Sequence, residues 1–199
     1  MDEQMKTVID ADFFRNITEY EHGGSLFLRV VDGLNMEPIM HEFVAESELA
    51  GNKYLKQLLD TGKVQIIHYD DYLMSEDREE YEKYFRAAYE RINQFDFPKG
   101  CDIYEYEEKG ESLGEIRSFY MAKIMGCQYF MSDDADARTL ANYFYLSKNK
   151  VDVRSLYEVF VMCKERNIGL RWKDINPTVC NAMNKRQDKV AKLKELYHK

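Results

Sequence analysis

The stretch QYFMSDDADA, residues 128–137, joins a short apolar run to a cluster of aspartates and then to a helical pattern. The stretch KTVIDAD, residues 6–12, has the same order of apolar run and aspartates near the start of the chain. Two more short apolar runs, at residues 64–67 and 151–153, also alternate with helical patterns. Short strands separated by helices are typical of a parallel sheet that is covered on both faces. We therefore expect an α/β fold with three layers, α/β/α, around a mostly parallel sheet of four or five strands.

Helical patterns fill the segments between these runs. They predict helices over residues 12–20, 25–34, 41–49, 53–59, 75–95, 113–125, 135–145, 155–166 and from about 175 to the end. No Ser-, Gly- or Pro-rich linker divides the chain, so we expect a single domain over residues 1–199. Within it, residues 75–110 are expected to form a helical insertion and residues 175–199 a basic C-terminal helix.

The composition excludes several classes of protein. Of the 199 residues, 45% are apolar and 32% are charged, which is typical of a folded globular chain. No apolar run approaches the ~20 residues of a membrane-spanning helix. The acidic start MDEQMKTVID lacks the basic end of a secretory signal. The four cysteines show no metal-binding or disulfide spacing, so we expect reduced thiols and a cytoplasmic protein.

The charge is acidic overall and unevenly distributed. A formal net charge of -8 argues against a protein whose whole surface binds nucleic acid, but it suits a nuclease whose acids gather around metal ions. Residues 185–199 are the exception, because Lys and Arg outnumber acidic residues there. Such a run can face phosphates, but we favour a solvated basic helix end beside the negative pole of the helix dipole.

Acidic side chains follow two of the predicted strands where each strand ends. Asp10 and Asp12 follow the first apolar run, and Asp133 and Asp134 follow the run at residues 128–131. Neighbouring parallel strands end at the same edge of a sheet, so Asp10 and Asp133 are expected to meet in one crevice. Clustered carboxylates need a cation, and oxygen-only ligands select Mg²⁺ or Mn²⁺. Each aspartate could instead cap the helix that follows it.

Two further groups of acids extend this set. Glu115 follows Ser112 in an S-x-x-E pattern, whose ordinary interpretation is a capping box at the start of a helix. Glu42 and Glu46 lie four residues apart and would share one face of a helix. Like charges at that spacing are slightly unfavourable on a solvated surface and useful beside a metal ion.

Together these pieces resemble the PIN-domain nucleases. The most specific match is residues 112–141, with a glutamate-led helix, a strand, the aspartate pair and an Arg-x-x-Ala helix that contains Arg138. The resemblance implies a nuclease that hydrolyses phosphodiester bonds of single-stranded RNA, or of DNA, with Mg²⁺ or Mn²⁺ as its cofactor. The metal would lower the pKa of a bound water and neutralise developing charge.

The resemblance also implies roles for individual residues. The catalytic acids would be Asp10, Glu115 and Asp133. The metal ligands would be Asp10, Glu46, Glu115, Asp133 and Asp134, and the auxiliary acids would be Glu42, Asp12 and Asp136, with Glu42 the alternative to Glu46 as fourth acid. Arg138 would bind substrate phosphate, or else pair with Asp134 or Asp136. Small PIN nucleases act as toxins silenced by an antitoxin, which implies a protein partner of that kind. A homodimer is expected on general grounds.

Two other functions remain open. The D-x-D of Asp10 and Asp12 also matches haloacid-dehalogenase-type phosphatases, in which the first aspartate attacks phosphorus and the second acts as acid and base. Against this, Phe14 stands where a threonine or valine is expected. Alternatively, the same fold is a non-catalytic module that binds a protein through the aromatic helix at residues 75–95. Close grouping of the acids favours the nuclease, and separation of Glu115 from Asp10 and Asp133 favours the binding module.

Overall fold

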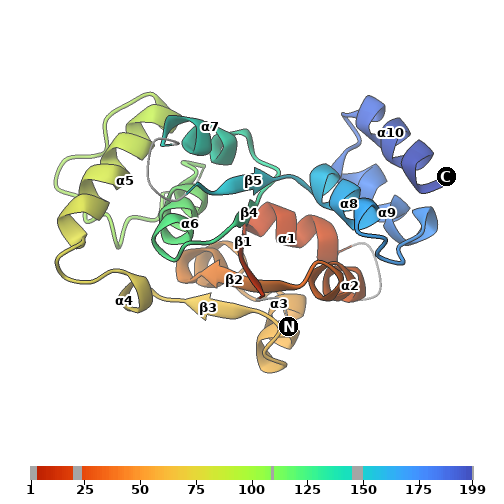
Figure 1. Ribbon diagram of the computed structural model, residues 1–199. Helices are drawn as coiled ribbons and strands as arrows, with labels where there is room; N and C mark the ends of the chain where they lie inside the picture. The colour runs from red at the N-terminus through yellow and green to blue at the C-terminus, as the bar shows by residue number, and fades with distance from the viewer. Residues whose placement is uncertain (1–3, 20–23, 109, 145–149, 199) are drawn as a thin grey trace.

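The computed structural model describes residues 4–19, 24–108, 110–144 and 150–198. Five parallel strands form one sheet in the order β3-β2-β1-β4-β5, and helices cover both of its faces (Figure 1). The strands are β1 (Met5–Ile9), β2 (Met36–His41), β3 (Gln65–Ile67), β4 (Tyr129–Met131) and β5 (Asp152–Arg154). The expected three-layer α/β/α fold is therefore confirmed, with a sheet that is entirely parallel.

Most of the predicted helices are confirmed, with ends that shift by a few residues. The helices are α1 (Ala11–Thr18), α2 (Ser25–Gly33), α3 (Lys53–Asp60), α4 (Tyr69–Tyr72), α5 (Arg78–Asn93), α6 (Leu113–Ile124), α7 (Ala135–Tyr143), α8 (Leu156–Glu165), α9 (Trp172–Ala182) and α10 (Gln187–His198), with a π-helical turn η2 (Val44–Glu48). The predicted helix ends at Tyr20, Tyr145 and Lys199 lie outside the described residues. None of the helices in the described ranges is long and apolar enough to cross a membrane.

Two elements were missed and one prediction is wrong. The sequence analysis missed β2, whereas the helix expected over residues 41–49 is confirmed over residues 42–48, where it includes the π-helical turn η2. The short helix α4 was not predicted. The helix expected from about residue 175 to the end is two helices, α9 and α10, separated by a turn at residues 183–186.

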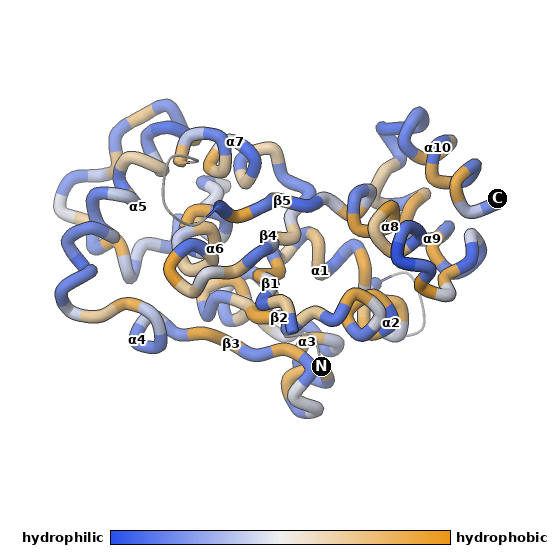
Figure 2. The backbone as a smooth tube through the Cα atoms, viewed as in Figure 1, coloured by the Kyte–Doolittle hydropathy of each residue, from blue (hydrophilic) through white to orange (hydrophobic). Residues whose placement is uncertain are grey.

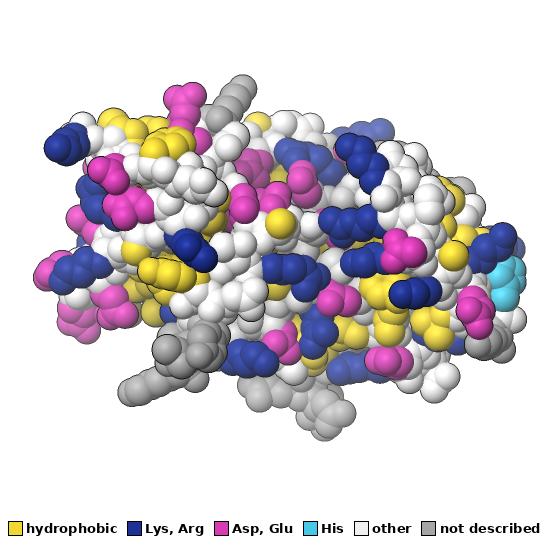
Figure 3. Space-filling model, turned by 90° about the horizontal axis from the view of Figure 1, so that it is seen from above, with side chains coloured by type: hydrophobic (Ala, Val, Ile, Leu, Met, Phe, Trp, Pro, Cys, Tyr) yellow, Lys and Arg dark blue, Asp and Glu magenta, His cyan; other side chains and the backbone are white. Residues whose placement is uncertain are grey.

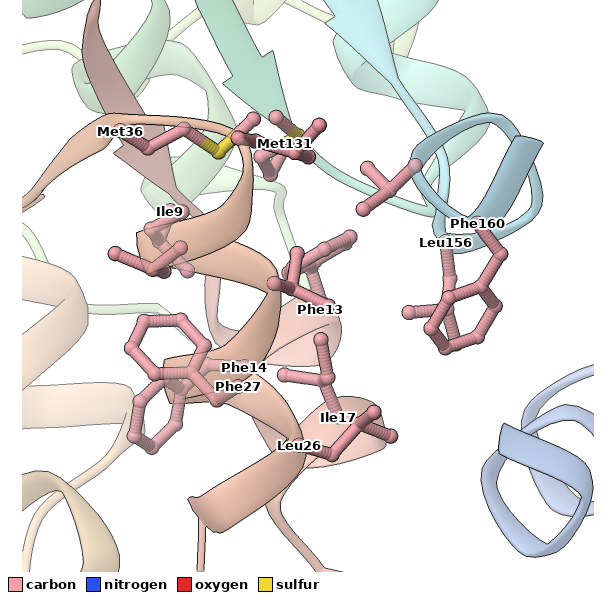
Figure 4. Close-up of a cluster of buried hydrophobic side chains, with 14 of the residues drawn as sticks. Ile9, Phe13, Phe14, Ile17, Leu26, Phe27, Met36, Met131, Leu156 and Phe160 are labelled. Atoms are coloured by element: carbon pink, nitrogen blue, oxygen red, sulfur yellow. The ribbon is translucent and has the colours of Figure 1, made fainter. Parts of the chain in front are cut away.

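Alternation along the strands builds a hydrophobic core on each face of the sheet. Val8 and Ile9 are adjacent, yet they belong to different buried clusters, because successive strand residues point to opposite faces. The cluster that contains Ile9 packs β1 against α1, α2 and α8, with the rings of Phe14 and Phe27 edge to face at 5.6 Å (Figure 4). The cluster that contains Val8 packs the other face against α5, α6 and α7. Figure 2 shows apolar residues along the central strands and at intervals along the covering helices.

The core fixes the direction of every strand, and this direction positions the site. All five strands are parallel, so their carboxyl ends lie at one edge of the sheet. The segments that follow β1, β2 and β4 therefore begin side by side, although they lie far apart in the sequence. Functional side chains of an open parallel sheet are expected at this edge.

Candidate metal-binding site

A cavity of about 1010 Å³ opens at the edge where β1, β2 and β4 end. Its lining comes from the start of α1, from η2 and the residues beside it, from the segment between α5 and α6, and from the starts of α6 and α7. Its acidic residues are Asp10, Asp12, Glu46, Glu48, Glu107, Glu108, Glu111, Glu115, Asp134 and Asp136. Arg15 is the one cationic residue in the described lining. The cavity is thus strongly negative.

Asp10 lies at the floor of this cavity, directly after β1. Its side chain is buried, and its Oδ2 accepts a hydrogen bond of 3.1 Å from the Ser132 hydroxyl. Its Oδ1 is buried and has no hydrogen-bond partner among the described residues. Asp10 occupies the N-cap position of α1 without capping it through its side chain. Burial, and then the charge of Glu48, raise the pKa of Asp10 to about 7.

Ser132 couples the end of β4 to the end of β1. Its hydroxyl donates to Asp10 and accepts the backbone N–H of Asp134 at 3.1 Å. Ser132 itself is fully buried, so it has no water to compete for these two bonds. Asp10 and the backbone of Asp134 are thereby held in a fixed relation, although they come from different strands.

Glu115 enters the cavity from the first turn of α6, and the capping box predicted for it is wrong. Ser112 has a left-handed backbone, with φ of 50°, and its side chain does not cap α6. The Ser112 hydroxyl instead donates to Asp136 at 2.7 Å. The Glu115 carboxyl is therefore free to face the other acids. Burial and the neighbouring charge of Asp10 raise its pKa to about 9.

Glu48 is a site residue that the sequence analysis did not select. Burial, and then the charge of Asp12, raise its pKa to about 7, whereas the charge of Arg15 opposes this shift. The carboxylate lies so close to Gly114 that a Cβ at this glycine would overlap it. The guanidinium of Arg15 donates to the Glu48 carbonyl at 2.6 Å and fixes the end of η2. Glu48 thus faces Asp10 and Glu115 across the cavity.

The π-helical turn η2 lies beside the cavity and brings both Glu46 and Glu48 to its lining. The prediction assumed a regular α-helix, in which Glu42 and Glu46 share a face. The wider η2 turn changes which side chains face the sheet edge. Glu42 does not line the cavity; its carboxylate instead contacts His68 Nδ1 at 2.6 Å and accepts the Tyr69 N–H at 3.0 Å. Glu46 lines the cavity as expected but is exposed, whereas Glu48 is half-buried and its charge raises the pKa of both Asp10 and Glu115. The acidic run itself was the only available signal for Glu48.

Asp133 lies outside the cavity lining, and Asp134 takes the place expected for it. The Asp133 carboxylate accepts the backbone N–H of Leu156 at 3.1 Å and contacts the Asn16 amide at 3.5 Å. Burial raises the pKa of Asp133, while these bonds and the charges of Arg186 and Lys189 oppose the shift. The geometry therefore does not support Asp133 as a catalytic or metal-binding acid. It serves to join β4 to the start of α8.

The remaining predicted residues divide between the cavity and its surroundings. Asp134 lines the cavity while also capping α7, because its Oδ1 accepts the Asp136 N–H at 2.8 Å. Asp12 and Asp136 also line it, and Asp12 pairs with Arg15 at 2.8 Å. Arg138 does not line it. It pairs with Glu158 at 2.6 Å, rather than with Asp134 or Asp136, so the role in substrate binding has no support from its position.

The side chains present fit a hard divalent cation in their chemistry. The carboxylates offer only oxygen ligands, and the orphaned Oδ1 of Asp10 lacks the partner that a buried carboxylate oxygen needs. Burial is the largest cause of the raised pKa in Asp10, Glu48 and Glu115. The charge of a neighbouring acid raises each of the three pKa values further. Within the described residues, no three Asp, Glu, His or Cys side chains are already arranged as a ligand set.

Comparisons of the chain with protein-family models, with curated proteins and with solved structures each gave no match. The assignment of the site therefore depends on its geometry and chemistry.

Proposed function

We propose that this protein is a Mg²⁺- or Mn²⁺-dependent nuclease of the PIN type that hydrolyses phosphodiester bonds of single-stranded RNA. One observation carries the proposal. Carboxylates from four separate elements, Asp10, Glu48, Glu115 and Asp134, line a single cavity at the carboxyl edge of a parallel sheet. Buried carboxyls that face one another are neutralised either by protons, which their raised pKa values reflect, or by a bound cation, and oxygen-only ligands suit a divalent cation.

The four acids would hold the cation, each from a different support. Ser132 orients Asp10 and holds the backbone of Asp134. Arg15 fixes the carbonyl of Glu48. A bound cation would lower the pKa of a water and neutralise charge that develops on the phosphate. Until the cation binds, the carboxyl of Glu115 holds a proton at neutral pH, and cation binding must release that proton.

Hydrolysis by an activated water requires no protein nucleophile. The described lining of the cavity contains no histidine, cysteine or lysine, so a Ser–His, Cys–His or lysine-dependent mechanism has no partner there. The phosphatase alternative would need Asp10 to attack phosphorus and Asp12 to act as acid. Asp12 is half-exposed and its carboxylate is paired with Arg15, so it is not free to act as that acid, which favours the nuclease.

The test is cleavage of a mixed panel of single-stranded RNA with Mn²⁺ or Mg²⁺. Asp10→Asn and Asp134→Asn are expected to reduce the rate about 100-fold or more, because metal catalysis supplies several kcal/mol. Asp133→Asn is the matched control. Its amide oxygen can still accept the Leu156 N–H, so it should retain activity and lose at most about 1 kcal/mol of stability.

Two results would contradict the proposal. One is the absence of metal-dependent cleavage across the panel together with no change in melting temperature on addition of Mn²⁺. The other is hydrolysis of p-nitrophenyl phosphate, a monoester, in preference to its diester, which would establish the phosphatase.

A further inference from the structure

The turn between α9 and α10 carries positive charge that the helix dipole does not explain. Lys185 and Arg186 directly precede α10, and Lys189 lies in its first turn. The sequence analysis attributed this charge to the C-terminal end of a helix, where cations are favoured. These three side chains instead lie at the N-terminal end of α10, where cations are disfavoured. We call these three residues the basic corner.

The cations of the basic corner form no ion pair with the described residues, although the charges of Arg186 and Lys189 act on the carboxylate of Asp133. No ion pair within the described ranges involves Lys185, Arg186 or Lys189. Lys185 and Arg186 are exposed, and Lys189 is partly buried. Asp133 is one partly buried carboxylate that already accepts hydrogen bonds from Leu156 and Asn16, so the three cations leave a net positive charge for a further anion.

Contacts place the basic corner next to the cavity. The ammonium group of Lys189 lies over the ring of Tyr157, 5.2 Å from its centre. Tyr157 belongs to the first turn of α8, where the N–H of Leu156 bonds to Asp133 at 3.1 Å. Asp133 precedes Asp134, which lines the cavity. Figure 3 shows Asp and Glu side chains near the middle of this face and Lys and Arg side chains over the part that α8 to α10 form.

The opposite side of the cavity has the reverse charge. Glu107, Glu108 and Glu111, from the segment between α5 and α6, line the cavity there. Figure 1 shows α5 to α7 at one end of the molecule and α8 to α10 at the other. A polyanion is repelled by the first end and attracted by the second, so the charge pattern defines one direction of approach.

We propose that the basic corner binds backbone phosphates of a single-stranded polynucleotide beside the phosphate that is cleaved. This inference rests on the proposed nuclease function and extends it. A dinucleotide or a small diester would fill only the acidic cavity, whereas a longer strand would also reach Arg186 and Lys189. The substrate class is therefore an extended single strand that enters over α8 and α10.

The test measures binding of a fluorescein-labelled single-stranded RNA oligonucleotide by anisotropy, in calcium buffer at several salt concentrations. The double variant Arg186→Gln/Lys189→Gln should bind more weakly, with a slope of log affinity against log salt that is lower by about 1.4, since each phosphate contact on a single strand contributes about 0.7. Its Mn²⁺-dependent hydrolysis of bis(p-nitrophenyl) phosphate should equal that of the wild type.

The control is Lys53→Gln/Lys56→Gln on α3, which removes the same charge. Lys53 also lies over a tyrosine ring, that of Tyr54 at 4.8 Å, so the two pairs of variants are matched in setting as well as in charge. Melting temperatures verify that both variants fold. Equal RNA binding by the two double variants would overturn the inference, even if the wild type cleaves RNA. If only Arg186→Gln/Lys189→Gln binds RNA more weakly, and the wild type hydrolyses no diester, the basic corner is supported as an RNA-binding site and the proposed nuclease activity is overturned.

Discussion

Asp133 and Asp134 are adjacent in the chain, yet their carboxylates lie in different surroundings. Asp133 bonds to the start of α8, and Asp134 lines the acidic cavity. At a strand end, the direction of each side chain depends on the turn that follows, and a shift of one residue reverses it. The sequence located this aspartate pair correctly but could not decide which member enters the site.

Glu48 gives the sharpest test of the site at the level of single residues. Glu48→Gln removes a buried charge beside Asp10, so we expect Mn²⁺ to bind at least about 10-fold more weakly in calorimetric titration. Without metal, the same variant should be at least as stable as the wild type, because repulsion among the acids is relieved. Glu46→Gln, on the same acidic run, is the control and should change neither quantity appreciably. Equal losses of Mn²⁺ affinity in the two variants would refute the assignment of Glu48.

Individual elements differed in how well their sequences predicted them. β1 and β4 are buried apolar runs that end in aspartates, and both were predicted. β2 was not predicted, and its Pro38 is unusual in a central strand. In the structure, β2 pairs with β1 from Met36 to Ile39 but with β3 only from Ile39 to His41. Pro38 thus lies where β2 has one neighbour, and its missing N–H is tolerated.

The segment between α5 and α6 depends on one buried guanidinium. Arg117, on α6, is fully buried and donates to the carbonyls of Ile103 at 2.9 Å and Tyr106 at 2.7 Å. It also lies over the ring of Phe43 at 4.0 Å. These contacts join the segment between α5 and α6, whose acidic residues line the cavity, to the helix that carries Glu115. The buried cation of Arg117 therefore holds in place a segment whose own charged side chains are mostly acidic.

Replacement of Arg117 should make the segment between α5 and α6 more mobile. Arg117→Met leaves two carbonyls without their donor, so we expect a loss of about 1–3 kcal/mol. Amide hydrogen exchange should accelerate most over residues 103–108. Arg138→Met, which removes only the half-exposed pair with Glu158, is the control and should cost less than about 1 kcal/mol. Unchanged exchange over residues 103–108 in Arg117→Met would show that the segment is held by other contacts.

The whole molecule combines two apolar cores with one acidic edge. The cores on both faces of the sheet stabilise the fold, while Asp10, Glu48 and Glu115 oppose it when they are charged. The short apolar runs predicted four of the five strands on which these cores pack, because the burial of a strand is reflected in its own apolar residues. The balance of charge at the site was harder to predict, since it depends on distances between segments that the sequence does not specify.

This balance predicts how stability depends on pH and metal. The pKa of Glu115 is raised from 4.5 to about 9, so between these values the folded chain holds a proton that the unfolded chain has lost. Stability without metal must therefore fall as pH rises through this window, by up to about 1.4 kcal/mol per pH unit for one such group. That loss corresponds to about 3–6 °C of melting temperature per pH unit in a chain of this size. His41, whose pKa is lowered to about 3, acts in the opposite direction only below its ordinary value of 6.5. The hydrogen bond to Glu42 raises the pKa of His68, which therefore acts in the same direction as the carboxyls, so a Glu115 variant is needed to separate the two.

Thermal melts from pH 7 to 8.5, with and without Mn²⁺, test this prediction. Mn²⁺ should raise the melting temperature, and the increase should grow with pH because the ion replaces protons at the site. Glu115→Gln cannot lose a proton, so its melting temperature without metal should depend less on pH than that of the wild type. If the melting temperature of the metal-free wild type is flat or rises from pH 7 to 8.5, Glu115 does not face the other carboxylates in solution. If it falls but Mn²⁺ fails to restore it, the acids are clustered and the cation that neutralises them is not a divalent metal of this kind.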